Sequence, residues 1–246
     1  MKYPICPFAL AVLCALTLVL AGCSASGAAP VSQPEAPPAA PAAAPTMVPK
    51  PTPGPTPEPV PEPTRQPGPD VQVVDGITYV NGILVANKTY ALPSDYNPGV
   101  DPNAQAAFDE MARAAANEGL NIYISSGFRS YDYQAGLYQR YVNRDGQAAA
   151  DTYSARPGHS EHQTGLAFDL NTISDSFANT PEGQWVAVHC HEYGFILRYP
   201  ADKVEITGYK YEPWHLRYLG VETATAVAES GLCLEEYLGI DSRYAE

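Results

Sequence analysis

Two histidines and two acidic residues in the second half of the chain have the residue types of a hydrolytic metal site. His162 and Asp169 lie seven positions apart, and Gly165 between them permits a turn. Far downstream, His215 follows Glu212 by three positions. Two histidines and one aspartate are three protein ligands, which leave the fourth position of a zinc ion open for water. The set would therefore suit hydrolysis at a zinc ion.

A carboxylate that is not itself a ligand would complete such a site. Zinc lowers the pKa of a bound water toward about 7, and a nearby carboxylate can take the proton and pass it to a leaving amine. Glu212 has the right type and is joined to His215 by a short segment. Spacing alone leaves a chance arrangement open, since such patterns are common. His159 would be a loop neighbour of the site, and His189 and His191 would lie on a helix surface or in its C-terminal turn.

The elements that must position these residues are short. Asp75-Gly76 and Asn81-Gly82 interrupt a β-rich stretch, which predicts short strands or a hairpin over 73–85. Further strands are predicted over 121–125, 166–170, 195–197 and 211–214, and helices over 103–117, 133–142, 181–193 and the end of the chain. Helices and strands without regular βαβ alternation indicate an α+β fold. We expect a single compact domain with a small antiparallel sheet flanked by helices.

The N-terminus is typical of a targeting sequence. Lys2 precedes an apolar run over 5–20, which is short for a membrane span and fits a signal peptide. The run ends in Leu-Ala-Gly-Cys at Cys23, which resembles a bacterial lipobox and predicts a lipid on the Cys23 thiol. An ordinary secretory signal and an uncleaved anchor helix are the alternatives. Each of the three places the rest of the chain outside the cytoplasm.

A proline-rich segment separates this leader, residues 1–23, from the domain. Residues 24–70 contain 16 prolines among 47 residues and no aromatic residue. Such a segment cannot bury enough apolar surface to offset its chain entropy, so we expect a disordered, extended linker. The domain then covers residues 71–246.

Charge and cysteine content restrict the partners and the cysteine chemistry. The chain has a formal net charge of −13, which argues against nucleic acid and against adhesion to anionic lipid. Membrane attachment would therefore depend on the N-terminal lipid alone. Cys190 and Cys233 are the two cysteines of the domain. In an oxidising compartment they could pair, and two free buried thiols are the equal alternative.

Four separated motifs carry a resemblance to a known family. They are SSGFRS at 125–130, S-x-H-x-x-G-x-A-x-D at 160–169, GFILRYP at 194–200 and EPWH at 212–215. In this order and spacing they resemble the VanY-type D-alanyl-D-alanine carboxypeptidases and the similar L,D-carboxypeptidases of peptidoglycan. Both are zinc metallopeptidases that share a fold with lysostaphin and the hedgehog signalling domain. The likeness covers residues 81–238.

The resemblance implies a role for each matching position. His162, Asp169 and His215 would bind Zn²⁺, and Glu212 would be the general base and later the proton donor. Arg129 would stabilise the oxyanion, for which its fixed cationic fork is suited. Two polar residues would hold the terminal carboxylate and a nearby amide of the substrate, and two aromatic residues would line the pocket: Ser160, Gln134, Tyr199 and Trp214. For these four, ordinary helix, loop and core roles stay open.

The reaction implied is that of a D-Ala-D-Ala carboxypeptidase, which removes the C-terminal D-alanine from peptidoglycan stem peptides. The enzyme would be anchored by lipid to the bacterial cell membrane and face the cell wall. An L,D-carboxypeptidase acting on tetrapeptides and a D,D-endopeptidase acting on cross-links are alternatives with the same chemistry. A non-catalytic wall-binding module and a zinc-storing or signalling relative are further alternatives. The presence of Glu212 argues against a module that only binds, because binding needs no base.

Overall fold

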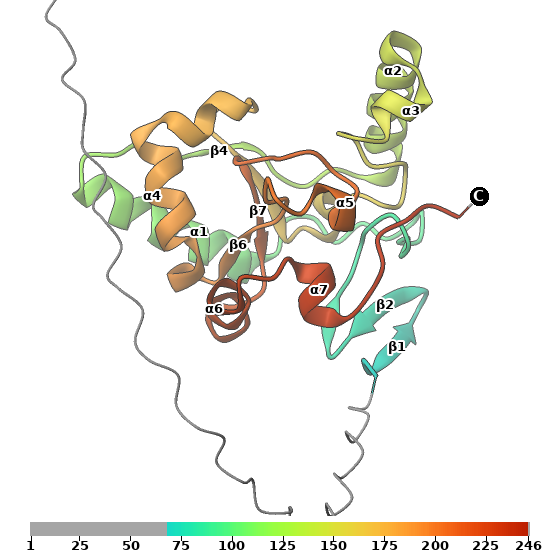
Figure 1. Cartoon of the computed structure of the whole chain (residues 1–246), viewed down its shortest axis with the longest axis horizontal. Helices are drawn as coiled ribbons and strands as arrows, with labels where there is room; N and C mark the ends of the chain where they lie inside the picture. Colours follow the sequence, from blue (N-terminus) through green and yellow to red (C-terminus); the bar gives the residue numbers. More distant parts are fainter. Residues whose placement is uncertain (1–67, 246) are drawn as a thin grey trace, which may run out of the picture. The chain divides into compact units, whose positions relative to one another are not determined.

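The computed structural model describes residues 68–245 of the chain (Figure 1). The predicted signal peptide, the lipidation site Cys23 and the linker up to residue 67 lie outside the described residues and stay predictions. Between residues 68 and 245, no helix combines the length and the apolar character needed to cross a bilayer.

Helices and short strands alternate irregularly along the domain. The strands are β1 Val71–Val74, β2 Ile77–Val80, β3 Ile83–Leu84, β4 Ile124–Ser126, β5 Ala167–Leu170, β6 Phe195–Leu197 and β7 His215–Tyr218. The α-helices are α1 Pro102–Asn117, α2 Tyr131–Asp145, α3 Gln147–Ala150, α4 Pro181–His189, α5 Val204–Thr207, α6 Val221–Ser230 and α7 Leu234–Leu238. Single 3₁₀ turns are η1 Glu161–Thr164, η2 Asp175–Asn179 and η3 Cys190–Tyr193. The predicted α+β class is confirmed.

The strands form two antiparallel sheets rather than the one that we expected. The first is the meander β1-β2-β3, and the second has the order β4-β5-β7-β6. Both links of the meander are two-residue turns with positive φ at each residue, Asp75-Gly76 and Asn81-Gly82. Those turn residues tolerate positive φ, as the tight hairpin turn requires. No strand of the meander is paired with a strand of the second sheet in the described residues.

Alternation along β5 and β7 gives the second sheet two different faces. On one face Phe168, Leu170 and Leu216 belong to an apolar cluster with residues of α1 and α4. In Figure 1 these two helices lie together beside the sheet. Full burial of one such side chain contributes about 1.5–3 kcal/mol. Asp169, between Phe168 and Leu170 on β5, and His215, directly before Leu216 on β7, must therefore point to the opposite face.

A second apolar cluster covers part of that opposite side. It joins Val80 of β2 and Ile196 of β6 to α6 and α7. The two clusters hold the central strands between them, while α2 and α3 stand away from the sheet (Figure 1). This second cluster covers only part of the face to which Asp169 and His215 point, so the rest of that face can carry polar side chains.

Two predicted strands begin at the wrong residue. The strand predicted over 121–125 is β4, Ile124–Ser126, and Tyr123 before it is 48% exposed rather than buried. The strand predicted over 211–214 is β7, which begins only at His215. Pro213 explains this shift, because proline has no N–H to donate to a central strand. Helix 181–193 ends at His189 and continues as a 3₁₀ turn.

The two cysteines of the domain are free and buried. Cys190 follows α4 and packs in the α1–α4 cluster. Cys233 precedes α7 as its N-cap. Of the two alternatives for these residues, the structure has two free thiols and no disulfide.

Candidate metal and active site

A sharp turn positions the first two candidate ligands. His162 lies in η1, and Gly165 ends this turn with φ +76° directly before β5. A Cβ at Gly165 would lie 2.0 Å from the carbonyl oxygen of Gly99, so the backbone passes where no side chain fits. The turn carries the chain from His162 into β5, where Asp169 is the third residue.

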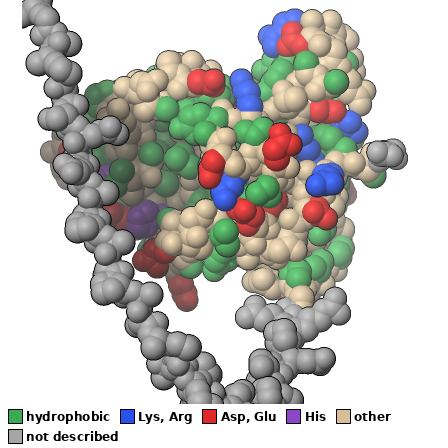
Figure 2. Space-filling view, viewed as in Figure 1, with side chains coloured by type: hydrophobic (Ala, Val, Ile, Leu, Met, Phe, Trp, Pro, Cys, Tyr) green, Lys and Arg blue, Asp and Glu red, His purple; other side chains and the backbone are tan. Residues whose placement is uncertain are grey.

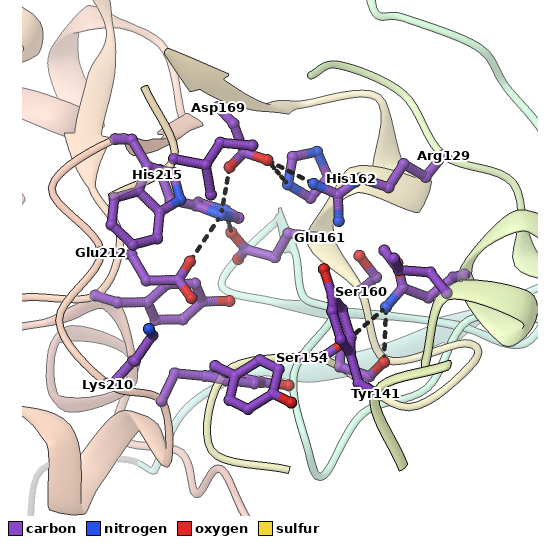
Figure 3. Close-up of a pocket in the computed structure, with 18 of the residues that line it drawn as sticks. Arg129, Tyr141, Ser154, Ser160, Glu161, His162, Asp169, Lys210, Glu212 and His215 are labelled. Atoms are coloured by element: carbon purple, nitrogen blue, oxygen red, sulfur yellow. Dashed lines mark hydrogen bonds and ion pairs between the residues drawn. The ribbon is translucent and has the colours of Figure 1, made fainter. Parts of the chain in front are cut away.

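Strand pairing adds the third candidate ligand. Asp169 and His215 are opposite each other in the ladder between β5 and β7. His215 Nδ1 lies 3.3 Å from Asp169 Oδ1, and His162 Nε2 lies 3.3 Å from Asp169 Oδ2. One ligand atom from each of the three residues lies within 4.8 Å of the others, and all three residues are buried (Figure 3).

These three residues fit a zinc ion. Asp169 Oδ1 is buried and has no hydrogen-bond partner within residues 68–245. His162 uses Nδ1 toward the carbonyl oxygen of Gly127 at 2.7 Å, which leaves Nε2 as its free ligand atom. Burial opposes ionisation of Asp169, but contacts with both histidines outweigh it and hold the pKa of this carboxyl well below its usual value. Two imidazole nitrogens and an ionised carboxylate are donors that zinc accepts.

Glu212 lies beside this cluster, on the Nδ1 side of His215. Its Oε2 is 3.5 Å from His215 Nδ1. The Glu212 carbonyl accepts a hydrogen bond from the His215 backbone N–H, which turns both side chains into the same pocket (Figure 3). Burial raises the pKa of Glu212, and the neighbouring His215 offsets this only in part. A carboxylate with a raised pKa is a stronger base than an exposed one.

Arg129 approaches the cluster from the segment after β4. Its Nη2 donates to Asp169 Oδ2 at 2.5 Å, and its Nε and Nη2 donate to Ser126 Oγ. Its backbone N–H donates to the carbonyl of His162. The guanidinium is therefore held from several sides at the edge of the pocket.

A cavity of about 550 Å³ opens above these residues. Its walls come from α2, the segment 153–155, the loop 173–175 and the segment 209–215. The space-filling view shows a notch between the α2–α3 lobe and the rest of the domain (Figure 2). The four predicted substrate residues, Ser160, Gln134, Tyr199 and Trp214, all line this cavity.

The hydrogen bonds of Gln134 fix what it can offer to a ligand. Its Nε2 donates to the carbonyl oxygen of Ala155 at 2.7 Å. Because a carbonyl only accepts, the amide oxygen must face the other way, and this Oε1 has no partner in the described part of the chain. Gln134 is therefore an acceptor. Ser160 precedes η1 and its hydroxyl makes no cap hydrogen bond to that turn.

The two aromatic residues belong to both the pocket and the core. The Tyr199 ring centroid lies 4.9 Å from that of His215 and 4.8 Å from that of Tyr209. Trp214 lines the cavity and is also part of the α1–α4 apolar cluster. Tyr199 and Trp214 are therefore both part of the pocket wall and part of the buried core.

The structure separates the remaining histidines from the site. His159 Nδ1 contacts the carbonyl of Asn87, and its ring packs edge-on against Tyr244 outside the cavity lining. His189 pairs with Glu192 after α4. His191 lies next to Thr225 of α6.

Sequence reasoning missed a buried acidic residue inside one of its own motifs. Glu161 lies between Ser160 and His162, is 2% exposed and contacts Arg198, Arg217 and His215. The available signal was the position of a charged residue directly beside a candidate ligand. Because charged residues are almost never fully buried unless they are paired, recognising Glu161 would also have required its arginine partners.

The chain is similar to known proteins over most of this domain. The VanY family model, described as D-alanyl-D-alanine carboxypeptidase, matches residues 97–221. A D-alanyl-D-alanine carboxypeptidase of Enterococcus faecalis is 38% identical over an alignment of 177 residues that covers 65% of this chain and 66% of that protein. The solved L,D-carboxypeptidase DacB from Streptococcus pneumoniae is 46% identical, with a TM-score of 0.65, over 72% of this chain and 98% of the other.

A third comparison concerns a solved structure that holds the metal. A vancomycin resistance D,D-pentapeptidase VanY variant in complex with Zn(II) is 35% identical, with a TM-score of 0.56, over 63% of this chain and 97% of the other. The match of the family model spans half of the chain, and it includes every candidate ligand and Glu212. This chain therefore belongs to the VanY family of carboxypeptidases and is a hydrolase.

Proposed function

We propose that this protein is a zinc-dependent carboxypeptidase that removes the C-terminal D-alanine from peptidoglycan stem peptides. The observation that carries the proposal is the buried cluster of His162, Asp169 and His215 with Glu212 beside it at the floor of a cavity. A module that only binds the wall would need neither the ligands nor the base.

Each polar group of the site has a distinct task in this reaction. His162, Asp169 and His215 would hold a zinc ion, which would polarise the substrate carbonyl and lower the pKa of a water molecule. Glu212 takes a proton from the attacking water and returns it to the nitrogen of the departing D-alanine. The hydroxyl oxygen stays on the carbonyl carbon as the C–N bond breaks, so the products are a shortened peptide and free D-alanine.

The remaining pocket residues orient the peptide. Arg129 stabilises the negative charge that develops on the carbonyl oxygen, because its guanidinium is held rigidly beside the cluster. Gln134, as an acceptor, suits an N–H of the substrate, and the Ser160 hydroxyl suits its terminal carboxylate. Tyr199 and Trp214 supply apolar walls.

An L,D-carboxypeptidase activity is the second candidate. The D,D and L,D activities release the same amino acid and differ in the residue that precedes it. The L,D-carboxypeptidase DacB is 46% identical to this chain, whereas the D,D-pentapeptidase VanY is 35% identical. This difference favours a tetrapeptide stem as substrate.

The test uses two synthetic stem peptides with the zinc-loaded protein. One ends in D-Ala-D-Ala and the other in a single D-Ala, and mass spectrometry follows the loss of one alanine. Loss from the pentapeptide alone identifies the D,D activity, and loss from the tetrapeptide identifies the L,D activity. If neither peptide changes while zinc is bound, the carboxypeptidase proposal is wrong.

We also propose that the enzyme lies outside the cytoplasm, held to the bacterial cell membrane by a lipid on Cys23. The lipobox-like sequence supports this location, as does the extracytoplasmic position of peptidoglycan. A Cys23→Ser variant is expected to leave the membrane fraction while its peptidase activity persists. Unchanged membrane association of that variant would contradict lipid anchoring at Cys23.

A further inference from the structure

Four charged residues form a closed cluster behind the candidate metal ligands. Glu161, Arg198, Arg217 and Glu235 are each at most 2% exposed. Arg198 Nε and Arg217 Nη1 both donate to Glu161 Oε1, at 2.7 and 2.9 Å. Arg198 also donates to both carboxylate oxygens of Glu235 on α7. We call these four residues the buried charge cluster.

One carboxylate oxygen of the buried charge cluster has no arginine partner and faces the candidate ligand His215. Glu161 Oε2 lies 3.5 Å from His215 Nε2 (Figure 3). Both atoms are buried, and neither has a hydrogen-bond partner among the described residues. An unsatisfied buried polar group costs about 1–3 kcal/mol, so two such atoms facing each other are natural partners.

We infer that Glu161 is a positioning residue that fixes the tautomer and orientation of His215. A carboxylate only accepts, so it holds the proton of the imidazole on Nε2. His215 Nδ1 is then unprotonated and points at Asp169 and the ligand cluster. Carboxylates that hold a metal-binding histidine in this way raise its basicity and its affinity for the ion. The inference rests on the zinc site of the proposed function.

The two arginines make this role specific to a carboxylate. They direct N–H donors at Oε1, so any amide placed here must turn its oxygen toward them. In a Glu161→Gln variant the amide NH₂ then faces His215 Nε2. A donor at this position favours the imidazole proton on Nδ1, the nitrogen that the metal needs. An almost isosteric substitution would thus reverse the tautomer.

Glu235 provides a matched control. It is equally buried, is also an acidic partner of Arg198, and has its carboxylate fixed by hydrogen bonds. Its other polar neighbour is Asn87, and it makes no hydrogen bond or ion pair with His162, Asp169 or His215 in residues 68–245. Glu161→Gln and Glu235→Gln therefore remove the same charge from the same cluster, and only the first changes a group that faces a ligand.

The experiment measures zinc affinity by competition with a chromophoric chelator, together with the melting temperature of each metal-free variant. Both variants are expected to lower the melting temperature. Zinc affinity should fall by about 10- to 100-fold in Glu161→Gln and stay close to wild type in Glu235→Gln. Equal zinc affinities in the two variants would overturn the inference and leave the cluster with a structural role only.

Two further arms keep the result interpretable. If Glu161→Gln does not fold, Glu161→Asp and Glu235→Asp give the same comparison, because each withdraws a carboxylate by one methylene from its partners. Failure of the wild-type protein to bind zinc would overturn the proposed function itself. Zinc binding and D-alanine release by the wild type, with unchanged affinity in the Glu161 variants, would overturn only the positioning role.

Discussion

Asp169 and His215 face each other across the antiparallel ladder of β5 and β7, with His215 Nδ1 3.3 Å from Asp169 Oδ1. Directly opposed residues of antiparallel strands have Cβ atoms about 4.5–5.5 Å apart. Two candidate ligands are therefore brought together by backbone hydrogen bonds rather than by loop conformation. His162 joins them through the turn at Gly165. A site built on strands in this way is positioned more precisely than one built on loops.

Removal of the metal should abolish activity and lower stability. A chelator is expected to stop D-alanine release, and added zinc should restore it. Free zinc at 1,000 times its dissociation constant would stabilise the fold by about 4.1 kcal/mol. Melting curves with and without zinc measure this shift. An Asp169→Asn variant, which loses the ligand charge with little change in size, should show almost no zinc-dependent shift.

Glu212 should be needed for turnover and dispensable for metal binding. Its Oε2 lies beside His215 but outside the ligand set. A Glu212→Gln variant is expected to lose about 10²–10⁴-fold in kcat, the usual contribution of a general base. Zinc content, measured by atomic absorption, should match that of the wild type. Loss of zinc from the purified variant would show that Glu212 is a ligand instead.

Gly165 should be the least replaceable glycine of the site. Gly165→Ala brings a Cβ within 2.0 Å of the Gly99 carbonyl oxygen in a left-handed conformation. Gly119, after α1, has φ +82° and open space around it, so Gly119→Ala should cost only the conformational strain of about 1–2 kcal/mol. The clash should add about 1–3 kcal/mol at Gly165. Urea unfolding of both variants tests this, and equal losses would contradict it.

Cys190 and Cys233 should be unreactive in the native protein. Burial raises the pKa of the Cys190 thiol to about 12, and it also raises the pKa of Cys233. Since only the thiolate is nucleophilic, Cys190 stays protonated at pH 8. Iodoacetamide should leave both residues unmodified in the native state and label both in denaturant, as mapped by peptide mass spectrometry. Labelling in denaturant only after reduction would reveal a disulfide.

The types and spacing of local residues made His162, Asp169, His215 and Glu212 candidates, and the resemblance of four separated motifs to the VanY-type carboxypeptidases singled them out. His162, Gly165 and Asp169 lie within one short segment, and Glu212 and His215 within another. Because these residues are close in sequence, and Gly165 permits a turn between the first two, few backbone conformations can separate their side chains. The I′-like turns at Asp75-Gly76 and Asn81-Gly82 were predictable for the same reason, because these residues tolerate positive φ.

Only the tertiary structure decided how distant segments meet. The pairing of Asp169 with His215, the start of β7 after Pro213 and the division into two sheets depend on long-range strand contacts. The role of Glu161 was hidden because a buried carboxylate is stable only when its cationic partners are present. Those partners come from β7 and the segment after β6, far along the chain. Local spacing thus placed the candidate groups in two short segments, and long-range packing determined which charges could be buried beside them.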